Sequence, residues 1–149
     1  MTYSELKKEL EDADLDDEVL AVIRNRKKLT SLEGIPKKFG VLLDLSSTEN
    51  LKSLKNGPVS VEGSLYLSNS GITSLDYLPK YIGSNLWLDG TKFSKKEEEV
   101  LKAVVKQNIT INGDIELGSS KVIPNHVIKK AQEENQKKRL STFSKFLDL

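Results

Sequence analysis

Three carboxylates in the second half of the chain have the types and spacing that could carry catalysis: Asp89, Asp114 and Glu116. If the segments that contain them form neighbouring strands, Asp89 and Glu116 would be diagonal neighbours about 7–8 Å apart. Such a separation suits a hydrolase in which one carboxylate protonates the leaving group and the other activates water. The same cluster could bind calcium, but no loop with regularly spaced acids accompanies it. We expect neither, and keep a carboxylate-based hydrolase as the last alternative.

Other catalytic and cofactor-binding patterns are absent from the sequence. His126 is the one histidine and there is no cysteine, so a thiol nucleophile, a thiolate metal site and a disulfide framework are excluded. The glycines recur at regular intervals, which accounts for them without a phosphate-binding loop. We therefore predict a protein that is not an enzyme and that uses no cofactor and no metal.

Charge is unevenly distributed along the 149 residues, whose net charge is +1. Residues 1–20 carry two lysines and eight acids, 2 − 8 = −6, whereas residues 121–149 carry seven cations and three acids, 7 − 3 = +4. These ends are either solvated helix faces or surfaces that attract head to tail between molecules. A nucleic-acid-associated protein is an alternative that would use the basic C-terminal run: Lys129, Lys130, Lys137, Lys138 and Arg139. Acids dilute this run and the overall pI is about 7.8, so we do not expect nucleic-acid binding.

The beginning of the chain, MTYSELKKELEDAD, is acidic and lacks the apolar core of a secretory signal. No apolar run approaches the roughly 20 residues that span a bilayer. We therefore expect a cytoplasmic protein with no membrane partner.

One short phrase occurs four times between Leu29 and Ser120. It reads FGVLLDL at 39–45, VEGSLYL at 61–67, IGSNLWL at 82–88 and INGDIEL at 111–117. Each copy ends in an apolar-x-Leu pair, and a hydroxyl residue follows three positions later: Thr48, Ser70, Thr91 and Ser120. The period of 21 to 22 residues is typical of leucine-rich repeats. We expect the alternating apolar residues to point inward, with leucines stacking copy upon copy.

The segment 29–123 resembles the leucine-rich-repeat superfamily, specifically the short proline-containing repeats of tailed-bacteriophage proteins, which carry phrases similar to GSLYLSNSGITSLDYLP. It is more distantly similar to bacterial leucine-rich-repeat effectors. The asparagine usual after the strand in that family is replaced here by serine or threonine. The resemblance implies an α/β fold, a short leucine-rich-repeat-like solenoid with about four parallel strands. It also implies a phage-encoded accessory protein in the host cytoplasm that binds and modulates or inhibits a host or defence protein.

Helices are expected to flank and interrupt the repeats. Residues 1–28 are predicted to form a helical cap, with Thr2 and Glu5 as a capping box and a second helix beginning after Asp14. An inserted helix is expected at 94–107, where Ser94 could cap it, because the fourth copy is about eight residues longer than the others.

The chain is predicted to end in a C-terminal helix at 124–149. Four apolar residues recur there at helical spacing and would share one face: Leu140, Phe143, Phe146 and Leu147. That face either folds back onto the domain, self-associates into a homodimer, or docks into a partner's groove.

Outward residues of the repeats form a central column on the predicted concave sheet: Asp44, Tyr66, Trp87 and Glu116. Tyr66 and Trp87 would be neighbours about 4.8 Å apart, and Trp87 would face solvent. Such aromatics are favoured anchors in interfaces, although a terminus could cover them or they could merely stack on each other. We predict a non-catalytic protein-binding module that binds through the concave strands, the C-terminal helix, or both. The candidate binding residues are Asp44, Tyr66, Trp87, Asp89, Asp114, Glu116, Phe143 and Phe146.

Overall fold

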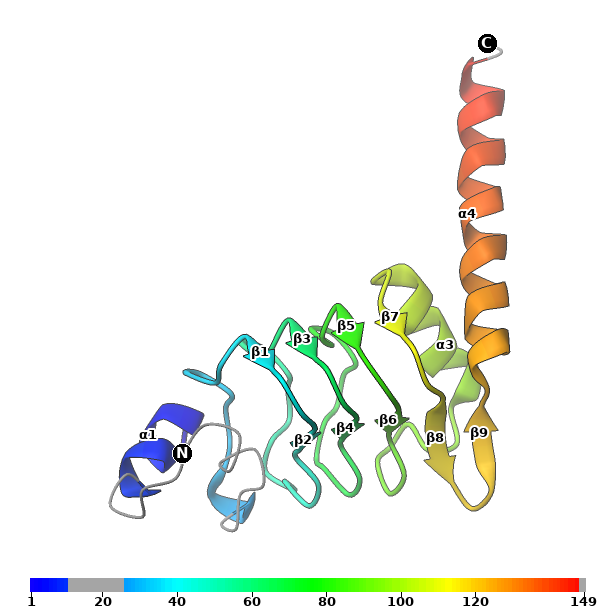
Figure 1. Cartoon of the computed structure of the whole chain (residues 1–149). Helices are drawn as coiled ribbons and strands as arrows, with labels where there is room; N and C mark the ends of the chain where they lie inside the picture. The colour runs from blue at the N-terminus through cyan, green and yellow to red at the C-terminus, as the bar shows by residue number, and fades with distance from the viewer. Residues whose placement is uncertain (11–25, 148–149) are drawn as a thin grey trace.

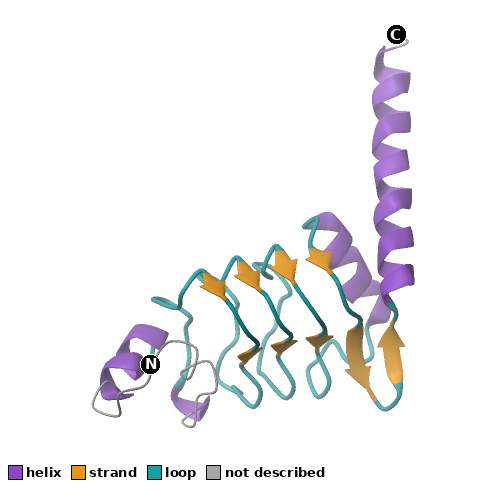
Figure 2. Cartoon of the chain, viewed as in Figure 1, coloured by secondary structure: helices purple, strands orange, loops and turns teal. Residues whose placement is uncertain are grey.

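A computed structural model describes residues 1–10 and 26–147 and shows an α/β chain (Figures 1 and 2). Its first helices are α1 (Tyr3–Leu10) and the short 3₁₀ helix η2 (Arg26–Lys28). Pairs of short strands follow: β1 (Lys38–Phe39) and β2 (Leu43–Asp44), β3 (Ser60–Val61) and β4 (Leu65–Tyr66), β5 (Tyr81–Ile82) and β6 (Leu86–Trp87). The chain then forms α3 (Glu97–Lys106), β7 (Thr110–Ile111), β8 (Ile115–Gly118), β9 (Lys121–Ile123) and α4 (Asn125–Leu147).

Each copy of the repeated phrase supplies one strand to each of two sheets. Among the described residues the sheet orders are β1-β3-β5-β7 and β2-β4-β6-β8-β9, and every pairing is parallel except that of β8 with β9. The second sheet contains the four expected parallel strands. The first sheet was not predicted. Its two-residue strands precede the glycines at which each copy bends, and runs this short leave no visible alternation in the sequence.

The predicted inward residues are confirmed as the core. The first apolar positions of the second sheet align as Leu43, Leu65, Leu86 and Ile115 in neighbouring strands. All four are at most 1% exposed, and the leucines two positions later are buried beside them. Leu51, Ile72 and other apolar residues of the linking segments complete the same cluster. Side chains of the same aliphatic kind therefore stack from one copy to the next, and their burial is the main force that holds the copies together.

The hydroxyl residues after the strands are buried in three copies and exposed in the fourth. Thr48, Ser70 and Thr91 are buried, and Thr48 Oγ1 donates to the Leu45 carbonyl at 2.6 Å. Ser120, by contrast, is exposed and has a φ of 65°, although its place in the repeated phrase is the same. The chain reverses after β8 to form the antiparallel strand β9, and Ser120 lies in that turn.

The helix α1 covers the open beginning of the stack. Its Tyr3 and Leu6 side chains are each 1% exposed, and the Tyr3 amide donates to the Ser31 carbonyl at 2.9 Å. The Glu5 amide donates to Thr2 Oγ1 at 3.1 Å, which confirms the predicted N-cap contact. The predicted second helix, beginning after Asp14, lies outside the described residues.

The inserted helix α3 lies within the predicted segment 94–107, and its Val100 and Val104 side chains are buried. Ser94 does not cap it, because the helix starts three residues later. Its N-cap residue is Lys96, which makes no side-chain capping hydrogen bond.

The helix α4 contacts α3 near its beginning and then projects away from the sheets (Figure 1). The expectation that its apolar end folds back onto the domain is contradicted, since Leu140, Phe143, Phe146 and Leu147 are 60–70% exposed. No glycine or proline interrupts residues 125–147, so one straight helix carries the end outward. Within residues 1–10 and 26–147, no helix combines the length and apolar character that crossing a membrane needs.

Candidate functional site

The predicted central column is formed by residues that are true neighbours across the second sheet. Asp44 pairs with Tyr66, Tyr66 with Trp87, and Trp87 with Glu116. We call these four residues the outward column. Each side chain is half-buried, in contrast to the fully buried residues immediately before and after it in the chain. The column is therefore the face of the sheet turned away from the core, as the alternation predicts.

Tyr66 and Trp87 form the aromatic centre of the outward column. Their ring centroids are 5.8 Å apart and their planes differ by 16°, so the rings are stacked. Stacked pairs of this kind stabilise by about 0.5–1.5 kcal/mol beyond their burial. Trp87 Nε1 is inaccessible and has no hydrogen-bond partner among the described residues, although the residue as a whole is half-buried. A ligand on this face would thus meet the ring surfaces before the indole N–H.

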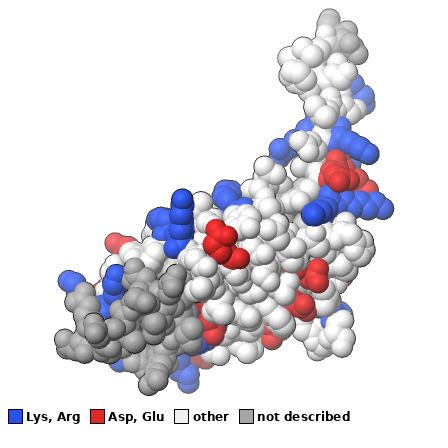
Figure 3. Space-filling model, in the orientation of Figure 1, with Lys and Arg blue, Asp and Glu red and all other residues white. Residues whose placement is uncertain are grey.

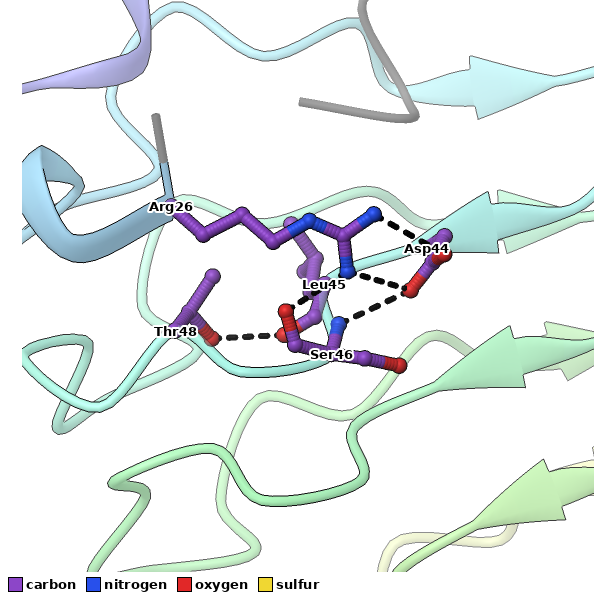
Figure 4. Close-up of polar contacts among 5 residues, drawn as sticks. All are labelled: Arg26, Asp44, Leu45, Ser46 and Thr48. Carbon is purple, nitrogen blue, oxygen red and sulfur yellow. Dashed lines mark hydrogen bonds and ion pairs between the residues drawn. The ribbon is translucent and has the colours of Figure 1, made fainter. Parts of the chain in front are cut away.

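Asp44, at the beginning of the outward column, is bound by an arginine from the N-terminal region (Figure 4). Arg26 Nη1 and Nη2 donate to the two carboxylate oxygens of Asp44 at 3.0 Å each, and Nη1 also donates to the Ser46 carbonyl at 2.7 Å. The Ser46 amide donates to Asp44 Oδ1 at 2.9 Å. Burial alone would raise the pKa of Asp44, but the bonds from Arg26 and Ser46 and the charge of Arg26 outweigh it and lower the pKa below 3.8.

This arrangement changes the role expected for Asp44. Its carboxylate is engaged within the chain, where the Arg26 and Asp44 side chains keep only 19% and 25% of their surface exposed. Arg26 could not be predicted as the partner of Asp44, because the two residues are separated by 18 positions and no local pattern joins them. The bidentate contact joins η2 to the second sheet, which positions the start of the column.

The predicted carboxylate cluster does not form one centre. Asp89 accepts a hydrogen bond from Ser68 Oγ, and Asp114 accepts one from the Asn125 amide at 2.8 Å at the start of α4. Glu116 lies in the column opposite Trp87, half-buried. In the part of the chain that the structure describes, no three His, Cys, Asp or Glu side chains gather where a metal ion could bind. Asp89 thus links two neighbouring copies of the repeat, whereas Asp114 links the fourth copy to the start of α4.

Phe143 and Phe146 lie apart from the outward column, on the end of α4 that projects from the body (Figure 1). Their side chains are 60% and 70% exposed, and together with Lys138, Arg139 and Thr142 they line a shallow depression along the helix. The eight predicted binding residues therefore occupy two surfaces, the sheet face and the α4 end.

Comparison of the chain with protein-family models, with curated proteins and with solved structures found no match.

Proposed function

We propose that this chain is a leucine-rich-repeat-like solenoid that acts as a non-catalytic protein-binding module, with the outward column as its binding face. The stacked pair of Tyr66 and Trp87 carries the proposal. Large, rigid aromatic side chains lose little conformational entropy on binding and are enriched among the residues that dominate interface energies. The pair sits in the middle of the column, where a partner could cover it from both sides.

The residues around this pair support a protein partner. Flanking positions hold small polar or amide side chains, among them Ser64, Ser68 and Asn85, all half-buried. An aromatic centre within a polar margin is the usual composition of a protein interface, where the margin excludes water from the anchors. The aliphatic core would be the scaffold for this surface.

The comparison between copies points in the same direction. Positions that face inward are nearly constant, being leucine, leucine, leucine and isoleucine in the first apolar position. The corresponding outward positions are aspartate, tyrosine, tryptophan and glutamate. Stacking of each copy on the next explains the constant inward residues, and the ion pair with Arg26 explains Asp44, but neither requires tyrosine and tryptophan at the next two outward positions. Recognition of a specific partner would require particular side chains at these outward positions.

The resemblance to phage repeats directs the choice of partner. We propose a phage-encoded accessory protein in the host cytoplasm that modulates or inhibits a bacterial host or defence protein. The nucleic-acid alternative would use the basic run on α4 instead, and would show retardation of DNA or RNA that weakens steeply as salt is raised.

The experiment compares capture of bacterial proteins by three immobilised forms of the chain. These are the wild type, the double variant Tyr66→Ala/Trp87→Ala, and Tyr77→Ala as a matched control. Tyr77 is an aromatic residue 58% exposed on a linking segment, outside the column. Circular dichroism and urea unfolding establish that each variant remains folded.

We expect a partner that binds the wild type and the control equally. It should bind the double variant about 1,000-fold more weakly, since the loss of two anchors at about 2 kcal/mol each removes about 4 kcal/mol. Trp87 is the only tryptophan, so its fluorescence reports directly on binding of the purified partner to this face. A partner that binds the folded double variant with full affinity would exclude the outward column.

A further inference from the structure

The outer half of α4 projects away from the body of the molecule (Figures 1 and 3), and only its first residues, among them Lys138 and Arg139, still line a depression beside α3. Every residue from Gln136 to Leu147 is exposed. These 12 residues extend for about 18 Å, and an isolated helix of this length is marginal in water. The segment nevertheless carries four large apolar side chains on one face: Leu140 (65% exposed), Phe143 (60%), Phe146 (70%) and Leu147 (65%).

This face is not an extension of the surface by which α4 contacts the body. Ile128 is buried there, and Ala131 and Asn135 are half-buried. At about 100° per residue, the mean direction of the outer apolar side chains is turned by roughly a quarter of a turn from those three. If the surface of the body that contacts α4 continued straight along the helix, it would still not cover Phe143. No described residue of the chain covers this face, which leaves it open to a separate molecule.

We propose that this occupant is a second copy of the chain, and that the outer halves of two α4 helices pair antiparallel about Phe143. In that register Leu140 of each copy lies opposite Phe146 of the other, and the two Phe143 rings meet at the two-fold axis. The face is then self-complementary, as a symmetric dimer requires.

The charges of the segment select the antiparallel direction. Residues 136–147 contain Lys137, Lys138, Arg139 and Lys145 and no acid. Parallel pairing would set each cation beside the same cation of the other chain. Antiparallel pairing sets Lys145 opposite Ser141, and brings Arg139 alongside the last turn of the other helix, where carbonyls without helical partners carry partial negative charge.

The area available indicates a weak, reversible dimer. The four side chains expose about 450 Å² per chain, or about 900 Å² for the pair, and the aliphatic parts of Lys138 and Arg139 add to this. Stable interfaces begin at about 1,200 Å² in total, so dissociation is expected in the micromolar range or above. Because both segments are cationic, salt should strengthen the dimer by screening their repulsion.

The experiment is sedimentation of the full chain over a concentration range from about 0.1 μM to about 1 mM, which extends well below and well above a micromolar dissociation constant. The wild type should move from 16.7 kDa towards twice that mass, and should dimerise more strongly in about 0.5 M than in about 0.05 M salt. Phe143→Ser/Phe146→Ser should weaken the dimer at least about 10-fold. Tyr77→Ser, another exposed aromatic, should leave it unchanged. A chain that stays monomeric at every concentration, or a dimer indifferent to Phe143 and Phe146, would overturn the proposal.

Disulfide trapping tests the direction of pairing, since the natural chain has no cysteine to interfere. A mixture of Leu140→Cys and Phe146→Cys chains should form the mixed disulfide in preference to either homodimer. Preferential homodimers would demonstrate parallel pairing and refute the proposed register. Retention of the monomer by anionic vesicles or DNA at low salt, lost with Phe143→Ser/Phe146→Ser, would assign the face to those ligands instead. None of these readouts depends on Tyr66 or Trp87, so this proposal and the binding function of the outward column can fail separately.

Discussion

Replacing Arg26 by alanine is expected to destabilise the fold by about 2 kcal/mol. Arg26 makes two 3.0 Å bonds to Asp44 and a 2.7 Å bond to the Ser46 carbonyl. Removing one partner of a fully buried ion pair costs about 3–5 kcal/mol, whereas exposed pairs contribute about 0–1 kcal/mol. The Arg26 and Asp44 side chains are 19% and 25% exposed, which places the loss between these limits. For a chain of 149 residues, the midpoint of thermal unfolding should fall by about 4–8 °C.

Urea unfolding followed by circular dichroism measures the effect for Arg26→Ala, Asp44→Ala and the double variant. We expect a coupling free energy of about 1–2 kcal/mol between the two positions. Arg26→Lys should recover only part of the loss, because an ammonium group cannot reproduce the bidentate contact. Lys27→Ala is the control: its 3.9 Å contact with Glu49 joins two mostly exposed side chains and should contribute almost nothing.

The same pair predicts a pH dependence. The pKa of Asp44 is lower in the folded chain than its ordinary 3.8, so its contribution is complete above that value and is lost as pH falls through the folded pKa. The difference in stability between the wild type and Arg26→Ala should therefore be constant near neutrality and shrink below about pH 4. A coupling near zero, or a difference that does not shrink in acid, would refute the argument that the ion pair joins η2 to the sheet.

Two further stability predictions concern the interior of the repeats. Thr91→Val should cost about 1–2 kcal/mol, because the buried Thr91 hydroxyl donates to a main-chain carbonyl at 2.7 Å. Ser70→Ala should be nearly neutral, since Ser70 Oγ is buried without a hydrogen-bond partner among the described residues. If both changes cost the same in urea unfolding, hydrogen bonding is not what distinguishes them. Gly83→Ala should cost about 1–3 kcal/mol, because its Cβ would lie 1.9 Å from the Glu62 carbonyl oxygen, whereas Ser84→Ala next to it should have little effect.

Much of the architecture could be predicted because the repeat shows itself in two local patterns, the alternation of apolar residues and the spacing between copies. Alternation between Leu65 and Leu67 assigns Tyr66 to the outer face, and the 21 to 22 residue spacing places Trp87 beside it. The pairing of Tyr66 with Trp87 is therefore confirmed at the level of single residues. That these residues bind a protein partner remains a prediction.

Other features depended on contacts that no local pattern records. The chain reversal after β8 follows a strand that reads like the three before it, yet β9 ends the parallel sheet and leaves Ser120 exposed. The predicted start of α3 was also wrong. Ser94 has the right residue type for an N-cap, but it lies too far from Glu97, the first helical residue. Secondary-structure ends depend on such competition between nearby polar groups and are poorly specified by residue type alone.

The sequence by itself determined which side chains are buried and which column faces outward, because burial of alternating leucines leaves one register that hides them all. The tertiary structure alone decided how the outward residues are used. It joined Asp44 to an arginine 18 residues away, tied Asp114 to the start of α4, and directed Phe143 into solvent. These outcomes depend on long-range geometry. The partner of a charged side chain and the direction of a projecting helix are set only once the core has brought distant segments together.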